Sequence, residues 1–168
     1  MTHAQRSLPR RRSGYTTTVT IGGEPLHLTA NEDADGRLAE VFVRWGKQGT
    51  ASAGLLDTYT AALSVGLAHR VPLADLIQPG LGLLFAPNGR TDDPELPRVR
   101  SVVDYLARRL AIDWLPYPDR AALGVFTLTE RVEQARPWLR AQDPVRFRTG
   151  RSAPVPATGG PHRPRTGD

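Results

Sequence analysis

The hydrophobic pattern of the chain changes its period once, at the glycine-containing segment that begins at Gly46. Before this point, residues 38–45 alternate, with Val41 and Val43 on one face of an extended segment. After it, apolar residues recur every three or four positions through residues 50–69. A period of two fits a strand and a period near 3.6 fits a helix. The sequence therefore predicts an α+β fold in which strands come first and helices follow.

Three strands are expected in the first part of the chain. Residues 15–22 are rich in β-branched side chains, and the Gly-Gly pair that follows favours a tight turn. A second strand is expected near residues 25–30, and the polar segment 31–37 then turns the chain into the third strand, residues 38–45. Because both connections are short, we expect a small antiparallel three-stranded meander.

The remaining elements are expected to form an amphipathic helix bundle. The first helix should cover residues 50–69, with Thr50 or Ser52 as its N-cap. A short helix should run from Pro72 to residue 77, because proline suits a first helical turn. Residues 78–97 contain several turn signals and are expected to be a loop. The apolar stripe of the first helix comprises Leu55, Leu56, Tyr59, Ala62, Leu63, Gly66 and Leu67.

A third long helix is expected over residues 98–112. On one side, Arg100, Asp104 and Arg108 lie four residues apart, a spacing that favours exposed ion pairs. A short helix is expected at residues 118–123, and the sequence from Thr127 to Glu130 matches a capping box that opens a helix to about Arg140. The apolar stripe of the third helix comprises Val99, Val102, Val103, Leu106 and Leu110.

Positive charge is concentrated at the two ends of the chain. Residues 1–14 contain four arginines and no acidic residue, and residues 141–168 contain five arginines and two aspartates. We interpret residues 1–14 as a disordered basic arm, residues 15–140 as a single α+β domain, and residues 141–168 as a disordered Pro/Gly/Arg-rich tail. Such ends can make weak, non-specific contacts with nucleic acid phosphates.

Several classes of chemistry are excluded by the residues that the chain lacks. The 168 residues include no cysteine, which excludes disulfides, thiolate metal ligands, thiyl radicals and dithiol redox pairs. The four histidines are not spaced as metal ligands, so no metal site is expected. No nucleophile elbow is present, so no catalytic residue is assigned. The first residues lack a secretory apolar segment, and a cytoplasmic protein without a membrane span is expected.

The turn at Gly46–Gly49 allows two interpretations. Gly49 and Thr50 at a helix start, with Lys47 nearby, offer backbone N–H groups to a phosphate. However, the chain lacks the spacing of a nucleoside-triphosphate loop, and a plain glycine turn between strand and helix is the favoured interpretation.

Four segments, in order, resemble one known family. The first is IGGEPLHLTANEDADGRLAEVFVRWGKQGT at residues 21–50, and the second is SAGLLDTYTAALSVGLAHRVPLADLI at residues 52–77. The third is FAPNGRTDDPELPRVRSVVDYLARRLAIDWLP at residues 85–116, and the fourth is RAALGVFTLTER at residues 120–131. Over roughly residues 16–131 the chain resembles the TSCPD-type C-terminal accessory domain of adenosylcobalamin-dependent (class II) ribonucleotide reductases.

The resemblance implies a role in deoxyribonucleotide biosynthesis and DNA synthesis, but not catalysis by this chain. The family's ribonucleoside-diphosphate reductase chemistry uses cysteines that are absent here, so no catalytic residue carries over and no cofactor is expected to bind. Adenosylcobalamin belongs to the related full-length enzyme. We therefore expect a free-standing accessory domain, with a large cobalamin-dependent reductase subunit as its partner. A partner surface is expected at Lys47, Asp104, Tyr105 and Arg108, which lie in the best-matching segments.

Two alternatives remain open from the sequence. The chain can be a non-enzymatic binding module that uses its basic ends on nucleic acid or on a protein partner. It can also be a decayed fragment that folds without a function. For Tyr105, packing beside Leu106 competes with a role in a partner surface, and packing is favoured.

Overall fold

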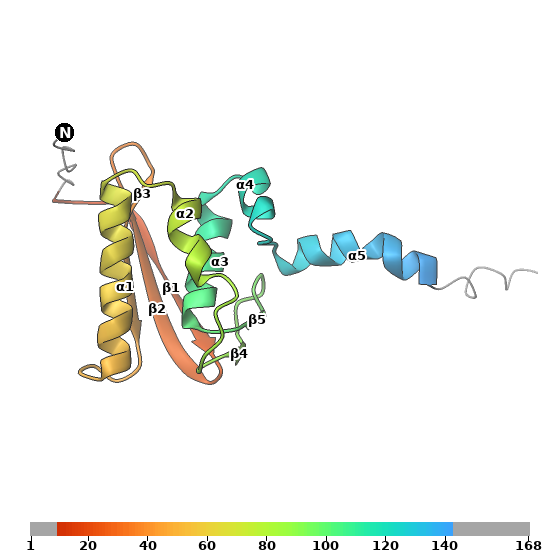
Figure 1. Cartoon of the computed structure of the whole chain (residues 1–168), viewed down its shortest axis with the longest axis horizontal. Helices are drawn as coiled ribbons and strands as arrows, with labels where there is room; N and C mark the ends of the chain where they lie inside the picture. Colours follow the sequence, from red (N-terminus) through yellow and green to blue (C-terminus); the bar gives the residue numbers. More distant parts are fainter. Residues whose placement is uncertain (1–9, 143–168) are drawn as a thin grey trace, which may run out of the picture. The chain divides into compact units, whose positions relative to one another are not determined.

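A computed structural model describes residues 10–142, and Figure 1 shows the order of its elements. The predictions of a disordered arm at residues 1–14 and a disordered tail at residues 141–168 fall mainly on residues outside this range. The described residues form two compact units, one ending at Glu133 and the other beginning at Gln134. The elements of the first unit carry the sheet and the core that are described below.

The three-stranded antiparallel meander predicted from the sequence is confirmed. Strands β1 (Gly14–Ile21), β2 (Glu24–Glu32) and β3 (Leu38–Trp45) pair in the order β1-β2-β3. Val19 lies opposite Leu26, which in turn lies opposite Trp45, so these three side chains share one face of the sheet. The opposite face carries Phe42, which is 50% exposed. The sheet therefore has one buried and one open face, as its alternating sequence predicts.

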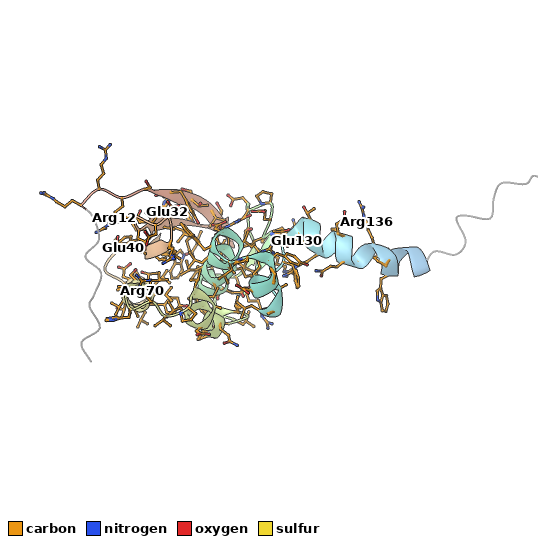
Figure 2. The ribbon with its side chains drawn as sticks, turned by 90° about the horizontal axis from the view of Figure 1, so that it is seen from above. Arg12, Glu32, Glu40, Arg70, Glu130 and Arg136 are labelled. Carbon is orange, nitrogen blue, oxygen red and sulfur yellow. The ribbon has the colours of Figure 1, made fainter. Side chains whose placement is uncertain are left out.

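On both outer strands, β1 and β3, side chains from elsewhere in the chain form hydrogen bonds with backbone groups. On β3, the Ser64 hydroxyl accepts a hydrogen bond from the Val41 N–H at 3.0 Å and donates one to the Val41 carbonyl at 3.2 Å. On β1, the Thr20 N–H donates to the Asp92 carboxylate at 2.7 Å, which lowers the pKa of Asp92. Figure 2 shows Arg12 beside Glu40, with which it forms an ion pair.

The helical part follows the predicted order. Helix α1 (Ala51–Ala68) lies along β3, and helix α2 (Leu73–Ile77) leads into a single 3-10 turn, η1 (Gln78–Gly80). Thr50 is the N-cap of α1, because its hydroxyl accepts a hydrogen bond from the Ala53 N–H at 3.3 Å. The last helices, α4 (Tyr117–Ala122) and α5 (Leu128–Gln142), also lie close to their predicted positions.

Helix α3 (Val102–Trp114) begins four residues later than the sequence predicts. Two short strands precede it, since β4 (Gly89–Arg90) pairs with β5 (Arg98–Val99). Ser101 then adopts an extended conformation, and its hydroxyl accepts a hydrogen bond from the Asp104 N–H at 3.0 Å. The prediction was wrong here because the apolar stripe begins in the short strand, at Val99, before the capped helix starts.

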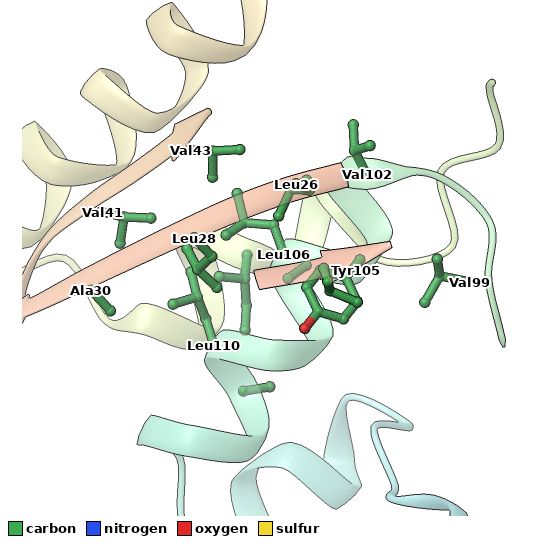
Figure 3. Close-up of a cluster of buried hydrophobic side chains, with 14 of the residues drawn as sticks. Leu26, Leu28, Ala30, Val41, Val43, Val99, Val102, Tyr105, Leu106 and Leu110 are labelled. Carbon is green, nitrogen blue, oxygen red and sulfur yellow. The ribbon is translucent and has the colours of Figure 1, made fainter. Parts of the chain in front are cut away.

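The core lies between the buried face of the sheet and helices α1 and α3. Figure 3 shows Leu26 and Leu28 of β2 facing Leu106 and Leu110 of α3. The α3 stripe is buried as predicted except for Val103, which is half-buried. One α1 expectation was wrong, because Leu55 is 72% exposed while its neighbour Leu56 is 6% exposed. Helical geometry turns adjacent residues about 100° apart, so only one of the two faces the sheet.

The capping box at the start of α5 is confirmed. The Thr127 N–H donates to Glu130 Oε2 at 2.9 Å, and the Glu130 N–H donates to the Thr127 hydroxyl at 3.3 Å. Arg120 of α4 binds the same carboxylate through two nitrogens, at 2.7 and 2.5 Å. Hydrogen bonding to Arg120, followed by the bond from the Thr127 N–H, lowers the pKa of Glu130 from 4.5 to about 2.

Replacing Leu106 by alanine should destabilise the domain by about 2–5 kcal/mol, because it leaves a cavity in a closely packed core. The matched control is Leu55→Ala, also on a helix, where 72% exposure leaves little packing to lose and a change within about 0.5 kcal/mol is expected. Urea unfolding followed by circular dichroism measures both. Equal losses in the two variants would contradict the assignment of the core.

Glu130 should make the stability of the α4–α5 junction depend on pH in the acid range. Its folded pKa of about 2 lies below the ordinary 4.5, so its stabilising effect is complete above pH 4.5 and is lost as the pH falls toward 2. Carbon-detected NMR titration of the Glu130 carboxyl measures this pKa directly. In Arg120→Gln the pKa should rise toward 4.5, and an unchanged pKa would show that the ion pair is not its cause.

Candidate partner surface

Asp104 fixes the loop that follows η1 to the start of α3. Its carboxylate is 1% exposed and accepts hydrogen bonds from the Gly82 N–H at 2.6 Å and the Arg100 N–H at 2.9 Å. Arg108, one helical turn later, donates its Nε–H to the same carboxylate at 2.9 Å. A buried charge with three donors is stable because its lost hydration is replaced. Asp104 is thus a structural clamp.

Tyr105 and Arg109 belong to a second buried polar network. The Tyr105 hydroxyl donates to Asp93 Oδ2 at 2.9 Å, while the ring is fully buried beside Leu106. Arg109 bridges Glu95 at 2.8 Å, Asp93 at 3.4 Å and Asp113 on its own helix. Burial, together with the negative charge of Asp93, raises the pKa of Tyr105. The network ties the 91–97 loop to α3.

The ion-pair network of Arg109 is strong enough to overcome its burial. Burial alone lowers the pKa of this guanidinium, but hydrogen bonds to Asp113 and Glu95 outweigh it, and the pKa of Arg109 is raised. Asp113 also accepts a hydrogen bond from the Tyr15 hydroxyl of β1, and burial followed by this bond raises the pKa of Tyr15. The first strand is therefore joined to α3 through one carboxylate.

Two of the four residues expected in a partner surface are inside the domain. Asp104 and Tyr105 are 1% and 0% exposed, so the expectation that their side chains contact a partner is corrected. The Asp104–Arg108 pair forms as its spacing predicts, but it is buried rather than exposed. Arg108 is largely covered, with 16% of its side chain exposed. Lys47 is exposed in the turn between β3 and α1, next to Thr50.

An apolar groove of about 490 Å³ lies between α1, η1 and the start of α3. None of the four residues expected in a partner surface lines this groove. Lys47 lies in the turn between the lining residues Trp45 and Ser52. Asp104 holds Gly82, which lies in the chain between the lining residues Gly80 and Leu83, and Arg108 bonds the same carboxylate. The groove is lined by Trp45, Ser52, Leu55, Leu56, Tyr59, Pro79, Gly80, Leu83, Phe85, Ala86, Val102 and Val103.

Two polar atoms on residues of the groove wall are buried without a partner. Among the residues that the structure describes, Trp45 Nε1 and Tyr59 Oη make no hydrogen bond, and neither does Arg108 Nη1. Burial raises the pKa of Tyr59, so its hydroxyl keeps its proton. Buried donors without partners are rare in folded proteins and are often satisfied by a bound group.

The described residues include no cluster of metal-ligand residues and no helix that could cross a membrane. Between residues 10 and 142, no group of three or more histidines, aspartates or glutamates is placed to hold a metal ion. No helix in this range is long and apolar enough to span a bilayer. The groove is lined by no histidine and no carboxylate, so its lining offers no metal ligand.

Sequence reasoning missed the groove because its walls come from four separate segments. The sequence pattern places Leu55 and Tyr59 in the apolar stripe of the first helix and predicts only a loop at residues 78–97. One signal was available. Residues 80–86 contain four large apolar side chains in an otherwise turn-rich segment, and exposed apolar clusters often mark binding surfaces.

A family model and several curated proteins match overlapping parts of this chain. A family model described as the TSCPD domain matches residues 2–113. The vitamin B12-dependent ribonucleotide reductase of Streptomyces avermitilis is 43% identical over 127 residues, which are 76% of this chain and 13% of that protein. The reductase of Agrobacterium fabrum with the same name is 33% identical over 118 residues, 70% of this chain and 9% of that protein.

The chain therefore spans only a small part of the curated relatives that it matches. The largest share among these relatives is 21%, for the vitamin B12-dependent ribonucleotide reductase of Streptantibioticus cattleyicolor, at 43% identity over 127 residues. No solved structure matches the chain.

The clamp role of Asp104 predicts that Asp104→Asn destabilises the domain by about 1–3 kcal/mol, because an amide N–H₂ then faces buried donors. Amide hydrogen exchange at Gly82 should become faster, since its N–H loses its acceptor. The matched control is Asp57→Asn, an exposed aspartate on α1, which should change neither quantity. Unchanged exchange at Gly82 in Asp104→Asn would contradict the clamp.

Proposed function

The chain belongs to the TSCPD domain family, and we propose that it is an accessory domain of a cobalamin-dependent ribonucleotide reductase. In this role it docks on the large catalytic part of the reductase and supports deoxyribonucleotide synthesis in the cytoplasm. The observation that carries the proposal is the match of 76% of the chain to about an eighth of reductases at 43% identity.

The proposal does not give this chain a catalytic step. Ribonucleotide reduction of the kind implied by the resemblance requires cysteines as radical carrier and electron donor, and the 168 residues contain none. We assign the adenosylcobalamin that the resemblance implies to the catalytic part of the reductase. Formation of deoxynucleotides by the purified chain with adenosylcobalamin and a dithiol would contradict this division of roles.

The exposed turn at Lys47 supports a docking surface on this side of the domain. Lys47 is the only lysine of the chain, is exposed, and lies two residues after the end of β3. Its turn is fixed, because the Thr50 hydroxyl donates to the Lys47 carbonyl at 2.9 Å while capping α1. A charge on a turn whose backbone is held in place favours recognition of an acidic partner group, since little loop order has to be gained on binding.

Capture of the tagged chain from its native cells tests the proposal. After nuclease treatment and in moderate salt, mass spectrometry of the bound material should identify a cobalamin-dependent reductase. In Lys47→Ala the recovered amount should fall by up to about fivefold, because an exposed ion pair contributes up to about 1 kcal/mol. The matched control is Arg37→Ala, an exposed cation in the β2–β3 turn.

The outcomes of the capture separate the two parts of the proposal. Absence of any reductase, or recovery only of material that nuclease removes, would overturn the accessory role. Equal recovery of the reductase by the wild-type chain and by Lys47→Ala would keep that role and reject the surface at Lys47.

A further inference from the structure

The outward face of α1 is exposed but carries no charge. The helix has 18 residues and a single charged one, Asp57, which lies beside this face, toward Phe42 and Arg44 of β3. Leu55 and Val65 on the face are 72% and 55% exposed. A helix that is apolar on all sides is normally covered on all sides. The outward face comprises seven exposed residues at the spacing of one helical side, Ala51, Gly54, Leu55, Thr58, Ala61, Ala62 and Val65.

The described elements leave the outward face of α1 open. The helix packs on β3 and lies at the edge of the first unit, as Figure 1 shows. The one hydroxyl of the face is already used, because Thr58 Oγ1 donates to the Gly54 carbonyl at 2.8 Å. The face therefore offers water no unused side-chain donor. Covering it removes apolar surface from water without breaking a side-chain hydrogen bond of the domain.

Gly54 plays no part in the packing of the domain. A Cβ added to it would meet no atom within 4 Å, whereas a Cβ at Gly66 of the same helix would lie 2.6 Å from Leu76 Cδ2. The backbone of Gly54 is ordinary α-helix, so its conformation does not require glycine either. Glycine destabilises a helix relative to alanine, because a more flexible backbone has to be ordered. The missing side chain instead suits a second helix that approaches this backbone closely.

The sizes of the side chains make the outward face complementary to itself. Thr58 is its centre, since the other six residues lie three, four and seven positions before and after it. In an antiparallel pair of helices with a two-fold axis at Thr58, residues before the centre on one copy meet residues after the centre on the other. Leu55 then meets Ala62, and Val65 meets Ala51. Each large side chain lies on a small one, as in closely packed helix pairs.

Electrostatics also favour the antiparallel arrangement. Two copies of an uncharged face meet without like charges in contact. Antiparallel helices place the positive N-terminal end of one dipole beside the negative C-terminal end of the other. Asp57 at the flank lines the same hollow as Arg44, so a cation accompanies it. A parallel pair would bring like dipole ends together and set Leu55 against Leu55 and Val65 against Val65.

The apolar surface continues beyond α1, but it is small. Leu55 also lines the apolar groove, whose rim includes Leu83 and Phe85, 47% and 37% exposed. The 18 residues of α1 span about 27 Å. One helix face of this length buries less than the roughly 800 Å² per copy of a standard interface. We therefore expect an association that depends on concentration rather than a permanent dimer.

We propose that two copies of this chain associate through the outward face of α1, antiparallel about a two-fold axis at Thr58. Leu55 and Val65 of each copy fill the spaces above Ala62 and Ala51 of the other copy. Gly54 allows the two backbones to approach. This proposal does not rest on docking on a reductase.

Disulfide formation in the full chain tests the register. The chain contains no cysteine, so each variant introduces a single thiol. Helix axes about 8–10 Å apart place facing Cα atoms about 3.5–5.5 Å apart, within reach of a disulfide. Thr58→Cys should therefore form a covalent dimer on mild oxidation, seen on a non-reducing gel. The matched control Thr18→Cys, exposed on the open face of the sheet, should stay monomeric.

Two further cysteine variants separate antiparallel from parallel pairing. Val65→Cys alone should form no disulfide, because its two copies lie about 21 Å apart along the antiparallel pair. A mixture of Ala51→Cys and Val65→Cys should form the mixed dimer. Circular dichroism reports that each variant is folded.

Sedimentation equilibrium from about 10 μM to about 1 mM, the range of weak affinities, measures the association itself. Gly54→Ala should weaken it by about tenfold or more, because two added methyl groups overpack the contact. The same change should leave the urea midpoint of the monomer equal or higher, since alanine favours the helix. Thr18→Leu, which adds an apolar side chain to the open face of the sheet, should leave the association unchanged.

The proposal is overturned if Val65→Cys forms a disulfide with itself as readily as Thr58→Cys, or if Gly54→Ala leaves the association unchanged. It is also overturned if the chain stays monomeric up to the highest concentration. If in that case Gly54→Leu lowers the capture of a reductase, the outward face of α1 belongs to that partner. Failure to capture a reductase leaves the dimer unaffected, so the two proposals can fail separately.

Discussion

The buried carboxylate of Asp104 determines how the second half of the domain is arranged. It joins a loop amide, a strand-end amide and a guanidinium, and these three donors come from Gly82, Arg100 and Arg108. A loop with few regular hydrogen bonds is thereby held to the start of α3, since each donor would otherwise lose its partner inside the protein. The wall of the groove formed by Gly80 and Leu83 flanks this loop position, so the shape of the groove depends on a residue that does not line it.

The buried polar network of Tyr105 and Arg109 also joins α3 to distant segments of the chain. Arg109 and Tyr105 bind the carboxylates of the 91–97 loop, and Asp113 at the end of the helix bonds Tyr15 of the first strand. The charged face of this helix is therefore used mainly for internal contacts. The polar residues of α3 lie in a segment that resembles the family, but they make bonds inside the domain. For this reason the resemblance of this segment did not predict a surface that contacts a partner.

The local sequence pattern predicted the secondary-structure elements well, but it predicted the contacts between distant segments less well. The third strand has its predicted bounds, and Thr50, Thr127 and Glu130 cap helices as expected, because strand alternation and capping depend on neighbours in the chain. The start of α3 was not predicted, because Val99 of the apolar stripe belongs to β5, which pairs with β4. The burial of Asp104 was not predicted, because its carboxylate is bonded by a residue as far away as Gly82. The groove was missed for the same reason. Four segments build it, and no single one of them shows its concave side in the sequence.

The side-chain bonds at the two outer strands have a consequence for how the chain behaves among its own copies. An open strand edge normally offers its amides and carbonyls to any other extended chain. Here the Ser64 hydroxyl occupies both backbone groups of Val41, and Asp92 occupies the N–H of Thr20. A neighbouring strand would have to displace a helix side chain on one edge and a carboxylate on the other. Together with the bridge between Ile21 and Thr91, these bonds occupy part of each edge and make the pairing of another strand there less favourable.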